Sequence, residues 1–93
     1  MELLKPEYTN RFKRQFKKLT AEQQQAVDRK VALLMRDPVD PGLMNKRVRG
    51  TRDIWEASVN ADIHLTWQRA RESGVIILRN VGMRDPAMHG PDS

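Results

Sequence analysis

Three short segments in the second half of the chain constrain the fold more than any other feature. Residues 54–59 carry Trp, Ala and Val at every second position, and residues 62–68 alternate Ile, Leu and Trp with Asp, His, Thr and Gln. A period of two is typical of β-strands. Residues 75–81 open with four apolar residues, which indicates a central strand covered on both faces. Because the connections are short, the pattern predicts an antiparallel meander.

The first half of the chain has the pattern of two helices. Apolar residues at positions 8, 12, 16 and 19 recur at helical spacing, opposite a face of Arg and Lys. Such a basic amphipathic helix can bind a membrane surface, but packing on a core is favoured. Thr20 and Gln23 are spaced as a capping box that would begin a second helix, which should end before Pro38. Residues 2–5, closed by Pro6, are a candidate edge strand.

Together these patterns predict an α+β fold. An N-terminal helix hairpin should pack on one face of a three- to four-stranded antiparallel sheet, and the other face should be polar. The expected organisation is one domain over residues 1–86, followed by a short C-terminal tail over residues 87–93.

Positive charge is concentrated in the first half of the chain. Residues 1–52 hold 13 Lys and Arg against 6 Asp and Glu, whereas residues 53–93 hold 4 against 6, and the net charge is +5. Such a field favours nucleic acid or an acidic protein as partner; the alternative is a solvated basic surface. The chain has no Cys, no signal-peptide pattern and no apolar run near the roughly 18 residues of a membrane span. A cytoplasmic protein without disulfides is therefore expected.

Three places in the sequence carry residues suited to chemistry. The first is a basic run whose dense charge suits phosphate contacts, at Lys46, Arg47, Arg49 and Arg52. The second is the pair Asp62 and His64, which share one face of a strand, so that the carboxylate can orient the imidazole for acid–base chemistry. The third is Arg84, just after the last strand, which can stabilise a phosphate that gains charge, with His89 as a proton donor.

Each of these features also has a purely structural interpretation. The basic run can be a solvated loop, the Asp62–His64 pair a common strand arrangement, Arg84 a surface salt bridge and His89 a residue of the tail. The sequence has no Gly-rich phosphate loop, no Ser-His-Asp order and no metal-ligand spacing, so neither a metal nor another cofactor is expected. A nuclease of this composition would use the 2′-hydroxyl of RNA as the nucleophile.

The chain resembles the RelE/ParE toxin superfamily of bacterial type II toxin–antitoxin systems, and within it the RelE and YafQ-like branch. The resemblance rests on the order and spacing of five stretches, which are residues 12–19, 46–50, 54–59, 62–67 and 77–85. It implies a RelE-like, microbial-ribonuclease-like fold and a toxin that enters the ribosomal decoding site and cuts mRNA. It also implies a small acidic antitoxin that wraps the toxin, and a heterotetramer with that antitoxin is one expected assembly.

The resemblance also assigns roles to individual residues. Arg84 matches the arginine that follows Val-Gly-x in RelE-like toxins, where many YafQ-like relatives have a histidine. His64 stands where the family often has an arginine, and Asp62 matches an acidic position of the YafQ-like site. Ser58 falls where that branch has a histidine, and His89 is the nearest match to a late aromatic or histidine residue.

Two other functions fit the same resemblance. The superfamily includes ParE-like inhibitors of DNA gyrase, which share the fold without a nuclease site. A catalytically weak homologue that only binds its antitoxin is the third possibility, because an arginine cannot take up a proton at neutral pH.

Overall fold

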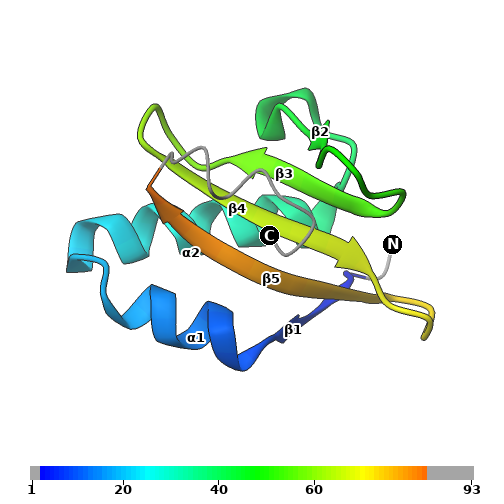
Figure 1. The fold of residues 1–93 in the computed structure, drawn as a ribbon, viewed down its shortest axis with the longest axis horizontal. Helices are drawn as coiled ribbons and strands as arrows, with labels where there is room; N and C mark the ends of the chain where they lie inside the picture. Colours follow the sequence, from blue (N-terminus) through cyan, green and yellow to red (C-terminus); the bar gives the residue numbers. More distant parts are fainter. Residues whose placement is uncertain (1–2, 84–93) are drawn as a thin grey trace.

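A five-stranded mixed β-sheet with two α-helices on one side makes up residues 3–83, the part of the chain that the computed structural model describes (Figure 1). The strand order is β1-β5-β4-β3-β2. The predicted meander is present: β3 (Ile54–Ser58), β4 (Ile63–Arg69) and β5 (Val75–Met83) pair antiparallel in sequence order. The predicted end of the domain at residue 86 and the tail, residues 87–93, lie outside the described residues.

Each helix begins at a threonine that caps it. The Thr9 hydroxyl accepts a hydrogen bond from the Phe12 amide at 3.1 Å, and α1 (Asn10–Lys17) follows. At α2 (Ala21–Arg36), Thr20 and Gln23 form the predicted capping box, with bonds of 3.1 and 2.9 Å. The second helix ends before Pro38, as predicted. These caps satisfy amides at the helix start that have no partner within the helix.

The N-terminal strand corrects the predicted sheet. β1 spans Lys5–Tyr8, rather than residues 2–5, and pairs parallel with β5, so the sheet is mixed and the first helix starts later than its apolar spacing indicated. Pro6 lies inside this strand, which is tolerated because β1 is at the edge of the sheet. A second correction is β2 (Lys46–Arg47), which pairs with β3 as the opposite edge where a loop was expected.

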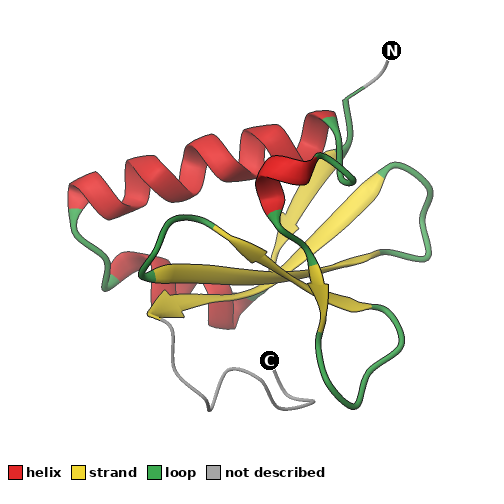
Figure 2. Cartoon of the chain, turned by 90° about the horizontal axis from the view of Figure 1, so that it is seen from above, coloured by secondary structure: helices red, strands yellow, loops and turns green. Residues whose placement is uncertain are grey.

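The helices cover the side of the sheet that carries the apolar core (Figure 2). α1 packs mainly on β5, and α2 contacts β1 and the 3-10 helix η1 (Pro41–Leu43). The two helices run in opposite directions (Figure 1), and the Gln24 amide donates to the Phe16 carbonyl at 3.0 Å between them. Neither described helix has the length and apolar character needed to cross a membrane.

The Thr9 cap of α1 and a side chain within that helix hold the far half of β5. β1 ends opposite Leu78, and beyond this point the Thr9 hydroxyl donates to the Arg79 carbonyl at 3.0 Å. The Val81 amide donates to the Gln15 side chain at 2.9 Å. The backbone polar groups of β5 that lie beyond β1 are therefore paired by Thr9 and α1, which follow β1 in the chain.

Candidate functional site

The face of the sheet opposite the core carries a row of buried polar side chains. Glu56 and His64 are each 5% exposed, and Thr66 and Asn80 are buried beside them. All four alternate with core residues such as Ala57 and Leu65 along their strands. Buried polar groups need hydrogen-bond partners, so this row is organised by specific contacts.

A β-bulge brings two consecutive residues of β5 to this face. Thr66 pairs with Asn80 while Trp67 pairs with Leu78, which leaves Arg79 as the extra residue. Arg79 then donates to the side chain of Gln68, and the Asn80 amide donates to the Thr66 hydroxyl at 3.3 Å. Without the bulge, regular alternation would put Arg79 and Asn80 on opposite faces.

His64 is bound to Glu56, not to the predicted partner Asp62. Nδ1 of His64 and Oε1 of Glu56 are in direct hydrogen-bond contact, and both side chains are buried. Asp62 precedes β4, is exposed, and its backbone amide bonds the Asn60 side chain at 2.8 Å. It lines a different cleft, beside Arg29 of α2. The expected Asp62–His64 pair is therefore wrong. Asp62 lies before β4 begins, whereas Glu56 lies within β3, the strand that pairs with β4.

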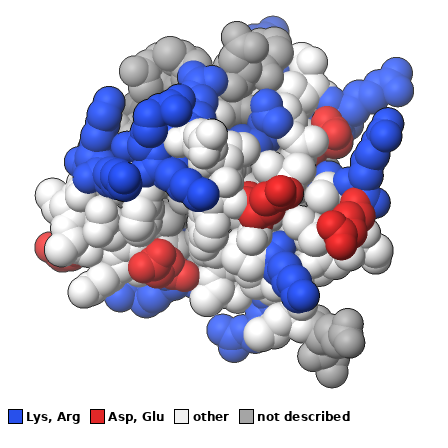
Figure 3. Space-filling model, turned by 90° about the horizontal axis from the view of Figure 1, so that it is seen from below, with Lys and Arg blue, Asp and Glu red and all other residues white. Residues whose placement is uncertain are grey.

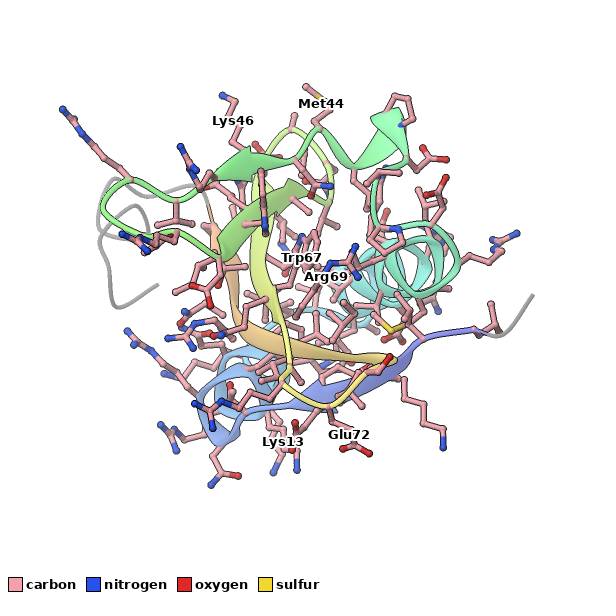
Figure 4. All side chains as sticks on the ribbon, turned by 90° about the vertical axis from the view of Figure 1, so that its right-hand side faces the viewer. Lys13, Met44, Lys46, Trp67, Arg69 and Glu72 are labelled. Carbon is pink, nitrogen blue, oxygen red and sulfur yellow. The ribbon has the colours of Figure 1, made fainter. Side chains whose placement is uncertain are left out.

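A cleft of about 380 Å³ opens at the edge of the sheet next to this pair. Its lining comes from several elements and includes Lys30, Met44, Lys46, Glu56, Ser58 and His64. The Lys30 ammonium donates to the Gly42 carbonyl at 3.0 Å, which holds α2 against η1. Lys46 is exposed and extends outward beside Met44 (Figure 4). The cleft thus combines an exposed ammonium with a buried imidazole that is bound to a carboxylate, and the ammonium suits an anion such as a phosphate.

The four predicted phosphate-binding residues lie close together in the chain and are all exposed. Lys46 and Arg47 form β2, and Arg49 and Arg52 lie in the turn that leads to β3. Of the four, the structure puts Lys46 in the cleft with His64. Their role in binding phosphate stays a prediction.

A second cleft, of about 430 Å³, shares Met44 with the first. Its contacts hold the fold together. Trp55 and Trp67 stack there with ring centroids 6.3 Å apart, next to Arg69 (Figure 4). The Trp67 indole donates to Asn45 at 3.1 Å, and the Asn45 amide donates to the Pro38 carbonyl at 2.7 Å. These bonds tie residues 38–45 to the sheet.

The basic face predicted for the first helix is exposed, as its spacing indicated. Phe12 is buried against the sheet, whereas Lys13, Arg14, Lys17 and Lys18 face solvent. Figure 3, which views the molecule from below, shows Lys and Arg side chains gathered over one part of the surface. This second basic surface belongs to a different element from β2 and its turn.

Beside α1, burial and then the negative charge of Asp28 raise the pKa of Tyr8 above its ordinary value of 10.0. Tyr8 lines a small apolar cleft with Phe12 and Phe16. Its phenol stays protonated at neutral pH.

Arg84 and His89 lie outside the described residues, so their predicted catalytic roles stay predictions. Ser58, which the resemblance placed at a histidine position, lines the cleft with His64. Among residues 3–83 no group of three His, Cys, Asp or Glu side chains is arranged to hold a metal ion.

Glu56 and Lys30 line the cleft but were not predicted from the sequence. Glu56 could have been found, because an alternating segment puts it on the polar face of β3 and a short hairpin brings that face beside His64. Nothing in the local sequence of α2 indicates that Lys30 reaches the cleft.

No protein-family model matches the chain, and no curated protein sequence is significantly similar to it. Solved structures are similar in fold. A chain of the RelBE2 toxin–antitoxin complex from Mycobacterium tuberculosis aligns with a TM-score of 0.71 and 20% identity, over 89% of this chain and 100% of that one. A mutant of the E. coli toxin RelE in the free state aligns with a TM-score of 0.74 and 16% identity, over 95% and 90%.

YafQ from E. coli also aligns, with a TM-score of 0.72 and 15% identity over 94% of this chain and 99% of that one. Identities this low establish the fold and leave the activity open. The likeness confirms the resemblance read from the sequence at the level of architecture, and the chain has the fold of the RelE/ParE toxin superfamily.

Proposed function

We propose that this protein is the toxin of a type II toxin–antitoxin system and that it cuts mRNA on the ribosome. The fold shared with RelE and YafQ supports the proposal. The observation that carries it is the cleft at the sheet edge, where His64 and Lys46 line one hollow beside an exposed basic turn. A polyanion with a reactive hydroxyl is the substrate that such a set of groups fits.

The proposed reaction needs no metal ion. The 2′-oxygen of one nucleotide attacks the adjacent phosphorus, the bond to the 5′-oxygen of the next nucleotide breaks, and a 2′,3′-cyclic phosphate and a free 5′-hydroxyl result. One proton leaves the 2′-hydroxyl and one reaches the departing 5′-oxygen. His64 exchanges a proton, Arg84 stabilises the charge on the phosphate, and His89 is a second candidate proton donor.

The exposed basic residues would hold the RNA around the reacting phosphate. Lys46 is in the cleft itself, and three arginines follow it toward β3, which are Arg47, Arg49 and Arg52. Contacts of this kind provide affinity without reading the base sequence.

The proposed partners are a cognate acidic antitoxin and the translating ribosome, in the cytoplasm. Neighbours in fold include chains from RelBE and RelE–RelB toxin–antitoxin complexes. The exposed basic face of α1 is suited by charge to an acidic protein. A heterotetramer of two toxins and two antitoxins is the proposed assembly.

The test is primer extension on a defined mRNA in a purified translation reaction. New 5′ ends that depend on both this protein and translating ribosomes are the expected result. His64→Gln and Arg84→Ala should each reduce cleavage by about 100-fold or more, within the range that acid–base and electrostatic catalysis provide. Cleavage within a few-fold of wild type in both variants would refute the assignment.

A charge-matched control separates phosphate binding from net charge. Lys46→Ala with Arg47→Ala removes two charges near the cleft, and Lys5→Ala with Arg36→Ala removes two exposed charges from β1 and α2. Only the first pair should weaken cleavage. If both double variants lose cleavage activity equally, the effect comes from the overall electrostatic field of the protein.

The burial of His64 supports a second candidate function. A 5% exposed imidazole that is bound to a carboxylate can also serve only to satisfy buried polar groups within the sheet. A toxin that binds a partner without cutting RNA, such as a ParE-like gyrase inhibitor or a protein that only binds its antitoxin, fits this burial. Intact mRNA together with blocked DNA supercoiling would select the gyrase inhibitor, and an effect on neither would select the antitoxin binder.

A further inference from the structure

Glu56 is a buried carboxylate to which neither sequence pattern nor the proposed chemistry has given a role. It lies in the middle of β3 and is 5% exposed. A buried carboxylate is costly unless it is paired and hydrogen-bonded. Its position therefore depends on the groups that surround it.

The strand register gives Glu56 two neighbours with basic side chains. Lys46 of β2 is directly across from it, and His64 of β4 is paired with Ser58, two residues along β3. The hydrogen bond forms with Nδ1 of His64, and among residues 3–83 no ion pair joins Glu56 to Lys46. The carboxylate thus engages the buried imidazole and leaves the ammonium exposed at the cleft.

A carboxylate bound at Nδ1 determines which nitrogen of the ring can act. When the carboxylate is ionised it can only accept a hydrogen bond, and the proton of the contact then lies on Nδ1. The other nitrogen, Nε2, is then the one left to gain or lose a proton, and the ring is held against rotation.

We propose that Glu56 is a positioning residue that holds His64 in one tautomer and one orientation, with Nε2 as the atom that exchanges protons. Its effect on RNA cleavage rests on the proposed function. Its effect on the imidazole does not, because that follows from the Glu56–His64 contact alone.

The test replaces Glu56 by glutamine, which has nearly the same shape. A glutamine amide can donate or accept, so it does not impose a tautomer. Nitrogen NMR of the histidine rings reports the tautomer directly, and the spectrum of His64→Gln assigns the signals, since the chain has two histidines. Glu72→Gln makes the same substitution in the exposed β4–β5 turn and serves as control (Figure 4).

We expect the wild type and Glu72→Gln to show one tautomer with the proton on Nδ1, and Glu56→Gln to show a mixture. In the translation reaction Glu56→Gln should cleave at least about tenfold more slowly than Glu72→Gln, a part of the roughly 100- to 10,000-fold that acid–base catalysis contributes. If Glu56→Gln fails to fold, Glu56→Asp, which withdraws the carboxylate from Nδ1 by one methylene, should give the same mixture.

The outcomes separate this inference from the proposed function. Unchanged ring-nitrogen signals in the Glu56 variants overturn it, whatever happens to RNA. Changed signals with cleavage equal to that of Glu72→Gln overturn the positioning role in the reaction. If the wild-type protein cuts no RNA, the proposed nuclease fails, and the ring-nitrogen spectra still decide whether Glu56 controls His64.

Discussion

Replacing Thr9 by valine tests how α1 and β5 are joined, because one hydroxyl serves both elements. The Thr9 side chain accepts from the Phe12 amide at 3.1 Å, as the cap of α1, and donates to the Arg79 carbonyl at 3.0 Å, on β5. Valine has nearly the same volume and suits the extended backbone of residue 9. Both bonds are lost with little change in packing.

The expected cost is the sum of two terms. Loss of a threonine cap costs about 1 kcal/mol. A part-buried carbonyl left without its donor costs about 1–3 kcal/mol more, less where water reaches it. Thr9→Val should therefore lower the free energy of unfolding by about 2–4 kcal/mol, out of the roughly 5–14 kcal/mol expected for a chain of this length. The melting temperature should fall by about 10 °C or more.

Urea denaturation measures this cost, followed by fluorescence of the two tryptophans, which both lie in the sheet. Thr9→Ser keeps the hydroxyl and should stay within about 1 kcal/mol of wild type. Thr20→Val is the matched control, because Thr20 caps α2 through local bonds alone. If Thr9→Val costs no more than Thr20→Val, the bond from α1 to β5 contributes nothing and the reasoning is wrong.

Three further predictions concern the core, the basic strand and the single tyrosine. Leu65→Ala should cost about 2–5 kcal/mol in urea denaturation because Leu65 is fully buried, whereas Val39→Ala, at a side chain 77% exposed, should change stability by less than about 0.5 kcal/mol. Lys46→Ala with Arg47→Ala should reduce the slope of log affinity for single-stranded RNA against log salt by about 1.4, at roughly 0.7 for each lost phosphate contact; an unchanged slope would remove both residues from the RNA surface. The raised pKa of Tyr8 means that the folded protein keeps this proton longer than the unfolded chain, so stability should fall as pH rises above 10.0. Ultraviolet titration of the tyrosinate should show the raised pKa, and the Tyr8→Phe variant should lack that part of the pH dependence.

Much of the architecture could be predicted because it is encoded over a few neighbouring residues. The alternation in residues 62–68 put His64 opposite the core side chains, and the structure has it there. The spacing of Thr20 and Gln23 predicted the start of α2, since a capping box needs contacts only within one turn.

The candidate site was predicted less well because its contacts join separate strands. Asp62 was chosen as the partner of His64 for its place in the sequence, but it lies before the strand begins. Glu56, eight residues away, becomes the partner because the β3–β4 hairpin aligns Ser58 with His64.

By itself, the sequence determined the meander, the two helices with their caps and the exposed basic faces, since periodicity and capping are local properties of the chain. Tertiary structure decided that β1 joins β5 in parallel, that a bulge brings Arg79 beside Asn80, and that His64 binds Glu56. These features depend on which backbone groups of distant segments pair and in what register. That choice is made by packing of the whole sheet on its helices, and no short stretch of residues encodes it.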